Sequence, residues 1–240
     1  MDALARLDGV RVRYADREEQ IQTPDLLILP GTKNTIDDLK WLRRTGLESP
    51  ILNCARKGIP VLGICGGYQM LGNEIDDSCG AETGEVVPGL GLLPVKTVFS
   101  LEKHRTRVKG RICAQSGIWG SVSGCECTGY EIHMGESRIC EENAQGFIQL
   151  TNQSDLSTRA DGCVRENVAG TYLHGIFDEV GFCGRLIETL CRQKGMNSAV
   201  SGQMSFWEYK QREYDKLADV IRENMDMEYL YLSLIHISEP

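Results

Sequence analysis

The sequence predicts an α/β protein in which a mostly parallel sheet carries helices on both faces. Two continuous apolar runs, LLILP (26–30) and VLGIC (61–65), are typical of strands that are buried on both sides. Each run ends at a turn that contains glycine, and an amphipathic helical segment lies between them. This alternation of strand and helix favours a parallel sheet covered by helices.

The segments beside these runs continue the same alternation of strand and helix. VRVRY (10–14) is β-rich and is expected to form the first strand. A helix is expected from Thr35, whose hydroxyl would cap the first turn. Its apolar face would hold Ile36, Leu39 and either Trp41 or Leu42.

The second half of the chain has a different sequence pattern. From Gly80 to about Asp161 glycines and prolines are frequent and helical periodicity is weak, which indicates short strands and loops. Residues 180–195 predict a helix with an apolar stripe that ends at Gly195. A last amphipathic helix is expected from about Ser205, with an inward face formed by Phe206, Tyr209, Leu217, Val220 and Ile221.

One domain is the expected organisation, because the chain contains no internal repeat, low-complexity tract or linker. This domain would span residues 1–229. The last residues, 230–240, are apolar and end without a helix stop, so they are interpreted as a non-native or disordered tail.

Composition excludes several classes of partner. Lys and Arg total 26 against 34 Asp and Glu, and the net charge of −8 offers no basic surface for nucleic acid. No apolar run approaches the ~20 residues of a membrane span, and the N-terminus lacks an export signal. The protein is therefore expected in the cytoplasm.

Ten cysteines are scattered through the chain, and in a cytoplasmic protein of this size they are expected to be reduced. Cys125 and Cys127 form a C-x-C pair, but no second pair stands at the spacing of zinc ligands. No metal site is expected.

Cys65 is the candidate nucleophile. In VLGICGGYQMLG (61–72) it stands between Gly63 and Gly67 with the spacing of a G-x-S-x-G nucleophile elbow. Such a turn would hold Cys65 in a strained, exposed position at a helix N-terminus, where the thiolate is favoured. The N–H of Gly66 would then form half of an oxyanion hole.

The turn PGTKNT (30–35) follows the neighbouring buried strand and is expected at the same edge of the sheet. Gly31 or Thr32 would present the second oxyanion donor there. Without the cysteine motif the segment would be interpreted as an ordinary β-to-α turn.

His174 is the expected base. His236 lies in the suspect tail and His104 in a charged run, so His133 and His174 remain. GTYLHGIF (170–177) resembles a buried strand that presents its histidine at the C-terminal edge, where Cys65 is also expected.

Five motifs in order resemble one known family: LLILPGTKNTIDDL, GICGGYQMLG, GLGLLPV, GYEIHMG and GTYLHGIF. Together they are similar to the glutamine amidotransferase domains of cobyric acid synthases, which are class I (triad-type) amidotransferases with a flavodoxin-like fold. The resemblance covers about residues 10–230.

The resemblance implies a glutaminase that forms a thioester on Cys65 and uses His174 as acid and base. Gln69, Thr32 and His133 are the residues it implies for contact with glutamine. The ammonia would pass to a synthetase domain that binds ATP and Mg²⁺ and amidates the corrinoid adenosylcobyrinic acid a,c-diamide. No cofactor is expected in this domain itself.

Two departures accompany the resemblance. Many class I glutaminases carry a glutamate two residues after the histidine, where this chain has Ile176. Either a Cys-His dyad or an orienting group from elsewhere, such as Asp178, would then replace the usual triad. The synthetase domain is expected to be missing, because no G-x-x-x-x-G-K-[ST] motif occurs. GLGLLP lacks the third glycine of a dinucleotide site.

GYEIHMG (129–135) is expected to form a strand with Tyr130, Ile132 and Met134 on the core face. Glu131 and His133 would then share the opposite face. If that face lines the cleft, His133 would shape the glutamine pocket or face the synthetase domain.

Other functions stay open at this point. The chain would serve as a docking module if it had lost turnover, or as a related amidotransferase that acts on cobyrinic acid or a cell-wall lipid precursor.

Overall fold

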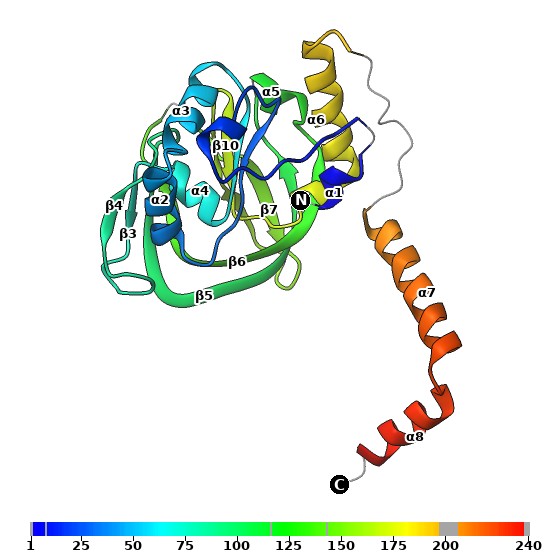
Figure 1. The fold of residues 1–240 in the computed structure, drawn as a ribbon. Coiled ribbons are helices and arrows are strands. Elements are labelled where there is room, and N and C mark those ends of the chain that lie inside the picture. The colour runs from blue at the N-terminus through cyan, green and yellow to red at the C-terminus, as the bar shows by residue number, and fades with distance from the viewer. Residues whose placement is uncertain (1, 8, 116, 143, 197–205, 238–240) are drawn as a thin grey trace. The chain divides into compact units, whose positions relative to one another are not determined.

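A computed structural model of the chain describes residues 2–7, 9–115, 117–142, 144–196 and 206–237 (Figure 1). The chain divides into two compact units, Met1–Ser201 and Gly202–Pro240. This boundary lies ahead of the expected one after residue 229.

The first unit contains, in chain order, α1 (Asp2–Ala5), η1 (Glu18–Gln20), β1 (Leu27–Leu29), α2 (Thr35–Arg44), α3 (Glu48–Arg56), β2 (Val61–Ile64), α4 (Gly66–Leu71), β3 (Glu74–Asp76), β4 (Val86–Pro88), β5 (Val95–Ile112), α5 (Gly117–Ser121), β6 (Glu126–Ile139), β7 (Ile148–Asn152), β8 (Thr158–Asp161), β9 (Cys163–Arg165), β10 (Val168–Thr171), η2 (Ile176–Asp178) and α6 (Val180–Gln193). The second unit contains α7 (Phe206–Asn224) and α8 (Met227–Ile237).

The first sheet positions the site. Its strand order is β1-β2-β10-β9, with β2 parallel to both β1 and β10 and with β9 antiparallel at the edge. All four residues of β2 are buried, as expected for a strand covered on both faces. Because β1, β2 and β10 are parallel, the segments that follow them meet at one edge of the sheet.

The second sheet contains two strands, β5 and β6, that are longer than the short strands expected. Its strand order is β4-β3-β5-β7-β8, and β6 pairs with β5. In Figure 1, β5 and β6 run together as a long curved ribbon, whereas short strands were expected between residues 80 and 161. The two strands pair from Val95 to Val98 and again from Lys103 to Arg111, which satisfies the backbone of residues whose own strand preference is weak.

The predicted helices of the first unit are confirmed, with one correction at a cap. Ile36 and Leu39 are fully buried on α2, and Trp41 is 37% exposed. The N-cap position is Asn34, without a side-chain cap, so the prediction that Thr35 caps this helix is wrong. The hydroxyl of Thr35 donates instead to Oε1 of Gln69 over 3.0 Å.

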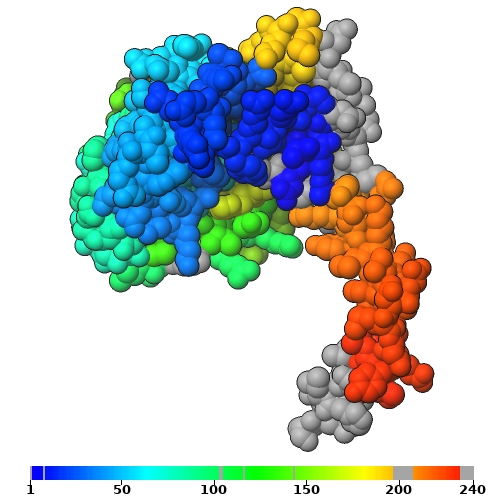
Figure 2. All heavy atoms as spheres, in the orientation of Figure 1, coloured from blue at the N-terminus to red at the C-terminus, as the bar shows by residue number. Residues whose placement is uncertain are grey.

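Helix α6 has the predicted buried stripe, and Gly195 has the left-handed φ of 68° that a C-terminal stop requires. The segment VRVRY (10–14) forms no strand. Its aromatic end, Tyr14, is 77% exposed, so the segment lacks the burial that would favour pairing. In Figure 2 the N-terminal residues, coloured blue, lie on the surface of the first unit. Helix α1 contacts η2.

In the second unit, Leu217 and Val220 of α7 are 55% and 54% exposed, and the inward face expected for this helix stays a prediction. Helix α8 occupies part of the segment that was expected to be a non-native or disordered tail. Ser205 and residues 238–240 lie outside the described residues.

Within the described part of the chain, no helix combines the length and the apolar character that crossing a bilayer requires.

Candidate active site

Cys65 occupies the expected elbow between strand and helix. It follows β2 directly and is the N-cap residue of α4, with φ 52° and ψ −112°. A positive φ at a residue other than glycine is strained and marks functional sites. The N–H of Cys65 donates to the carbonyl of Thr171 in β10 over 2.8 Å, which ties the elbow to the central sheet.

The glycines after Cys65 permit this turn. A Cβ on Gly67 would stand 2.1 Å from the carbonyl oxygen of Leu29, and a Cβ on Gly66 would stand 2.3 Å from Cγ2 of Thr32. Since neither position has room for a side chain, the elbow packs directly against the end of β1 and the turn that follows it.

The sulfur is not the exposed thiolate that the motif suggested. Cys65 is 7% exposed, and its Sγ donates to the carbonyl of Ile132 in β6 over 3.4 Å. Burial raises the pKa of the Cys65 thiol, although the N–H of Gly66 lowers it. The net shift is upward, so the N–H at the start of α4 does not offset this desolvation. The resting nucleophile is therefore a thiol that a strand carbonyl covers.

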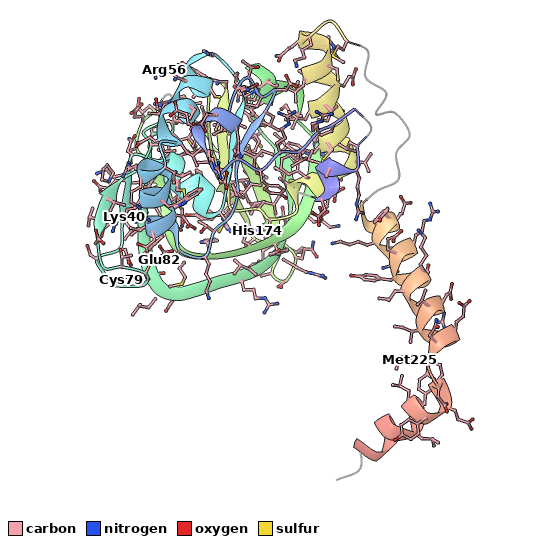
Figure 3. The ribbon with its side chains drawn as sticks, viewed as in Figure 1. Lys40, Arg56, Cys79, Glu82, His174 and Met225 are labelled. Atoms are coloured by element: carbon pink, nitrogen blue, oxygen red, sulfur yellow. The ribbon has the colours of Figure 1, made fainter. Side chains whose placement is uncertain are left out.

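His174 lies beside Cys65, as predicted. A Cβ on Gly31 would stand 3.1 Å from Cε1 of His174 and 3.4 Å from Cβ of Cys65, so both side chains border the same point. The backbone of His174 pairs with Tyr130 of β6 through hydrogen bonds of 2.9 and 3.2 Å. The two aromatic rings stack with centroids 5.1 Å apart, which fixes the plane of the imidazole. Figure 3 labels His174.

The electrostatic surroundings of His174 suit a neutral base. Burial lowers the pKa of its imidazole, while the charge of Glu131 and the carbonyl of Ile132 raise it. Its Nε2 is buried and has no hydrogen-bond partner among the residues that the structure describes. An unpaired buried nitrogen is free to accept a proton from a reacting group.

The backbone donors of the predicted oxyanion hole lie together. The nitrogen of Thr32 is 3.2 Å from the position that a Cβ on Gly66 would take, so the turn after β1 faces the start of α4. The N–H groups of Gly31 and Thr32 donate to no other described residue. The Thr32 hydroxyl donates to Asp38. The arrangement offers backbone donors to a developing oxyanion beside the sulfur.

Gln69 is engaged within the protein. Its Oε1 accepts from Thr35, and its Nε2 donates to the carbonyl of Met134 over 3.3 Å and to the Tyr172 hydroxyl over 3.1 Å. The residue is 3% exposed. These bonds connect α4, which carries Gln69, to α2 and β6. The contact of Gln69 with glutamine stays a prediction.

The faces expected for GYEIHMG are wrong at its first two side chains, since Tyr130 is 47% exposed while Glu131 is fully buried. Ile132, His133 and Met134 are all half-buried, so the strand shows no clear alternation there. Nδ1 of His133 lies 2.9 Å from the carbonyl oxygen of Gly135, and its ring stacks on Tyr172 with centroids 3.9 Å apart. A role for His133 in glutamine contact stays a prediction.

The group that orients His174 is not found at its usual place. Ile176 is fully buried and apolar, and Asp178 follows in η2, where its role stays a prediction. Glu131, which is paired with Arg159, is a charge that acts on His174. Sequence reasoning singled out the motif of Glu131 and Ile132 but missed their roles, because these depend on which face of β6 meets the nucleophile.

Among the described residues, no three His, Cys, Asp or Glu side chains are grouped to hold a metal ion. The absence of a metal or cofactor from this domain stays a prediction.

Comparison with known proteins identifies relatives over nearly the whole chain. A protein named cobyric acid synthase from Lachnoclostridium phytofermentans is 43% identical over 235 residues, which is 95% of this chain and 46% of the relative. One of the same name from Citrobacter koseri is 40% identical over 242 residues, which is 100% of this chain and 47% of the relative. The chain thus spans about half the length of the curated relatives it matches.

Solved structures share the fold at low identity. A crystal structure of a glutamine amidotransferase aligns with a TM-score of 0.53 and 18% identity, covering 81% of this chain and 92% of that one. The structure of PurLQS from Thermotoga maritima aligns with a TM-score of 0.53 and 18% identity, covering 80% and 90% of the two chains. The α/β fold is therefore that of class I glutamine amidotransferases.

Residues 1–182 match the family described as CobB/CobQ-like glutamine amidotransferase domain. This match includes the elbow at Cys65 and the histidine beside it, and the chain belongs to that family.

Proposed function

We propose that this chain is the glutaminase part of a cobyric acid synthase. The observation that carries the proposal is the meeting of Cys65, at its strained elbow, with His174 at one edge of the parallel sheet. A cysteine beside a buried neutral imidazole and free backbone donors is suited to acyl transfer from an amide.

In the proposed reaction, Sγ of Cys65 leaves the carbonyl of Ile132 and attacks the side-chain amide carbon of glutamine while His174 takes the thiol proton. The oxyanion is stabilised by the N–H of Gly66 together with that of Gly31 or Thr32. The carbon–nitrogen bond breaks as His174 protonates the leaving nitrogen, and ammonia departs from a glutamyl thioester.

Hydrolysis then restores the enzyme. His174 removes a proton from water, the resulting hydroxide attacks the thioester carbon, and the carbon–sulfur bond breaks. The proton returns to sulfur and glutamate is released, so the thiol of Cys65 is regenerated.

The ammonia would serve a synthetase part that binds ATP and Mg²⁺ and amidates adenosylcobyrinic acid a,c-diamide. Support comes from the relatives, which are about twice as long as this chain and are named cobyric acid synthases. We place the reaction in the cytoplasm, in keeping with ten free cysteines.

The proposal is tested by measuring the ammonia that the chain releases from glutamine when the synthetase part is supplied. Cys65→Ser is expected to abolish release, since a hydroxyl is a much weaker nucleophile than a thiolate. Cys191→Ser, in which a half-buried cysteine of α6 is changed, is the matched control and should keep full activity. Equal turnover by the Cys65→Ser chain would remove this residue from the mechanism. A wild-type chain that releases no ammonia would favour the docking module instead.

A further inference from the structure

In the proposed reaction His174 alternates between a neutral imidazole and a charged imidazolium. A histidine in that role works best when a neighbouring group fixes its ring and stabilises its charged form. Ile176 is buried and apolar, so it does neither. The carboxylate of Glu131 acts on His174 by its charge, but it is paired with Arg159. The group that covers the imidazole ring itself is the aromatic side chain of Tyr130.

The backbone of β6 brings Tyr130 directly opposite His174. The two residues form an isolated antiparallel bridge, in which each backbone N–H donates to the carbonyl of the other. A Cβ on Gly129 would collide with the carbonyl oxygen of His174, so glycine at this position lets β6 approach closely. Because directly paired residues carry their side chains on the same face, the two rings meet on one side of the bridge.

The two rings have the geometry of an aromatic stack. Their centroids are 5.1 Å apart and their planes differ by only 5°. Tyr130 is 47% exposed, so its ring covers the imidazole while part of the side chain stays open to solvent. The contact uses the ring face, and Nε2 of His174 keeps no hydrogen-bond partner among the described residues. The ring is therefore held without occupying the nitrogen that takes a proton.

An aromatic face also favours the charged form of the imidazole. The π electrons make the face of a phenol ring partly negative, and a cation within about 6 Å of the ring centroid is attracted to it. We propose that Tyr130 is a positioning residue for His174, whose ring fixes the imidazole plane and stabilises the imidazolium formed when His174 takes the thiol proton. This inference rests on the proposed glutaminase function.

Loss of the aromatic face is expected to appear in kcat. The imidazolium forms only as His174 takes the proton from Cys65, so its attraction to the Tyr130 ring is made in the transition state and not with bound glutamine. Removing the face should therefore lower kcat and kcat/KM equally, by roughly 2- to 30-fold, and leave KM unchanged.

The experiment compares Tyr130→Phe with Tyr130→Leu in the full chain supplied with its synthetase part. Phenylalanine keeps the ring and lacks only the hydroxyl, so this variant should release ammonia from glutamine at the wild-type rate. Leucine keeps an apolar cover over the imidazole but has no aromatic face, so Tyr130→Leu should show the loss in kcat. Tyr14→Leu is the control, because Tyr14 is 77% exposed ahead of β1 and should keep full activity when changed.

Three kinetic results would overturn the inference. An unchanged kcat in Tyr130→Leu would show that the aromatic face is not needed. An equal loss in Tyr130→Phe and Tyr130→Leu would assign the effect to the hydroxyl. A rise in KM without a fall in kcat would make Tyr130 a contact for the substrate.

Nuclear magnetic resonance tests the contact without turnover. The Cε1–H resonance of His174, assigned by its absence from His174→Asn, should move in Tyr130→Leu and keep its position in Tyr130→Phe, because only an aromatic ring exerts a ring current. Titration of this resonance should give a lower pKa for His174 in Tyr130→Leu than in wild type. A pKa that is not lowered would contradict the stabilisation of the imidazolium.

These measurements also separate the inference from the proposed function. A wild-type chain without Cys65-dependent ammonia release marks failure of the proposed function itself. A lowered pKa of His174 in Tyr130→Leu would then still support the stabilisation of its charged form by Tyr130.

Discussion

The thiol of Cys65 and the imidazole of His174 border the same point of the site and are expected to form a neutral pair. Burial raises the pKa of Cys65 above its ordinary 9.0 and lowers the pKa of His174 below its ordinary 6.5. Between those values the sulfur keeps its proton and the imidazole lacks one. His174 therefore acts as a base throughout the neutral range and loses this ability only as pH falls through its lowered pKa.

We expect alkylation of Cys65 by iodoacetamide to accelerate only as pH rises through a value above 9.0, because the thiolate is the reactive form. Mass spectrometry of the labelled peptides measures this rate, and the exposed Cys79 provides an accessible thiol for comparison. A plateau of Cys65 labelling in the neutral range would reveal a thiolate paired with imidazolium and contradict the neutral pair.

Gln69 is expected to matter first for stability. Gln69→Ala removes its bonds to Thr35, Met134 and Tyr172, and the free energy of unfolding should fall by about 1–3 kcal/mol. Urea unfolding measures the change, with Gln193→Ala at the exposed end of α6 as the control. Unchanged stability together with a raised KM for glutamine would indicate that Gln69 contacts the substrate directly.

Among the elements, β6 passes over the elbow and covers the sulfur of Cys65, so the nucleophile is closed off in this structure. Carbonyls of this strand accept from Cys65 and Gln69, and its backbone pairs with His174. The β5–β6 ladder shifts register between Val98 and Lys103, beside Gly135 with its φ of 89°. The pairing of the strand that covers the sulfur is therefore interrupted at Gly135, between two regular stretches of the ladder.

The contact between the start of α4 and the end of β1 should tolerate no side chain. Gly67→Ala would drive a Cβ into the carbonyl of Leu29, and we expect about 1–3 kcal/mol of destabilisation or more. Gly184→Ala is the matched control: no atom lies within 4 Å of its new Cβ in α6, so it should stabilise by up to about 1 kcal/mol. Thermal unfolding compares the two, and equal stability of both variants would refute the close packing of the elbow.

At the level of the entire chain, the first unit is expected to fold alone. The buried apolar side chains among the described residues lie between Ala3 and Leu190. Removal of residues 202–240 should change the free energy of unfolding of the remainder by less than about 0.5 kcal/mol. Circular dichroism during heating checks this. Loss of a cooperative transition in the shortened chain would show that the last helices support the first unit.

Local patterns were sufficient for the strands β1 and β2, for helices α2 and α6, and for the placement of Cys65 and His174 at one edge of the sheet. Continuous apolar runs, helical spacing and a glycine-flanked cysteine reflect constraints that act between neighbours in the chain. The parallel order of β1, β2 and β10 then carries the two reactive residues to one edge.

Long-range contacts decided the rest. The carbonyl of Ile132 covers the sulfur of Cys65, and the carboxylate of Glu82 accepts from the N–H of Ile36, so both contacts join segments that are distant in sequence. The burial of Glu131 instead of Tyr130 also depends on distant segments. An alternating strand has two faces, and only its partners determine which face is buried. Desolvation likewise depends on all the atoms that surround a group, so the protonated state of Cys65 could be read only from the folded protein.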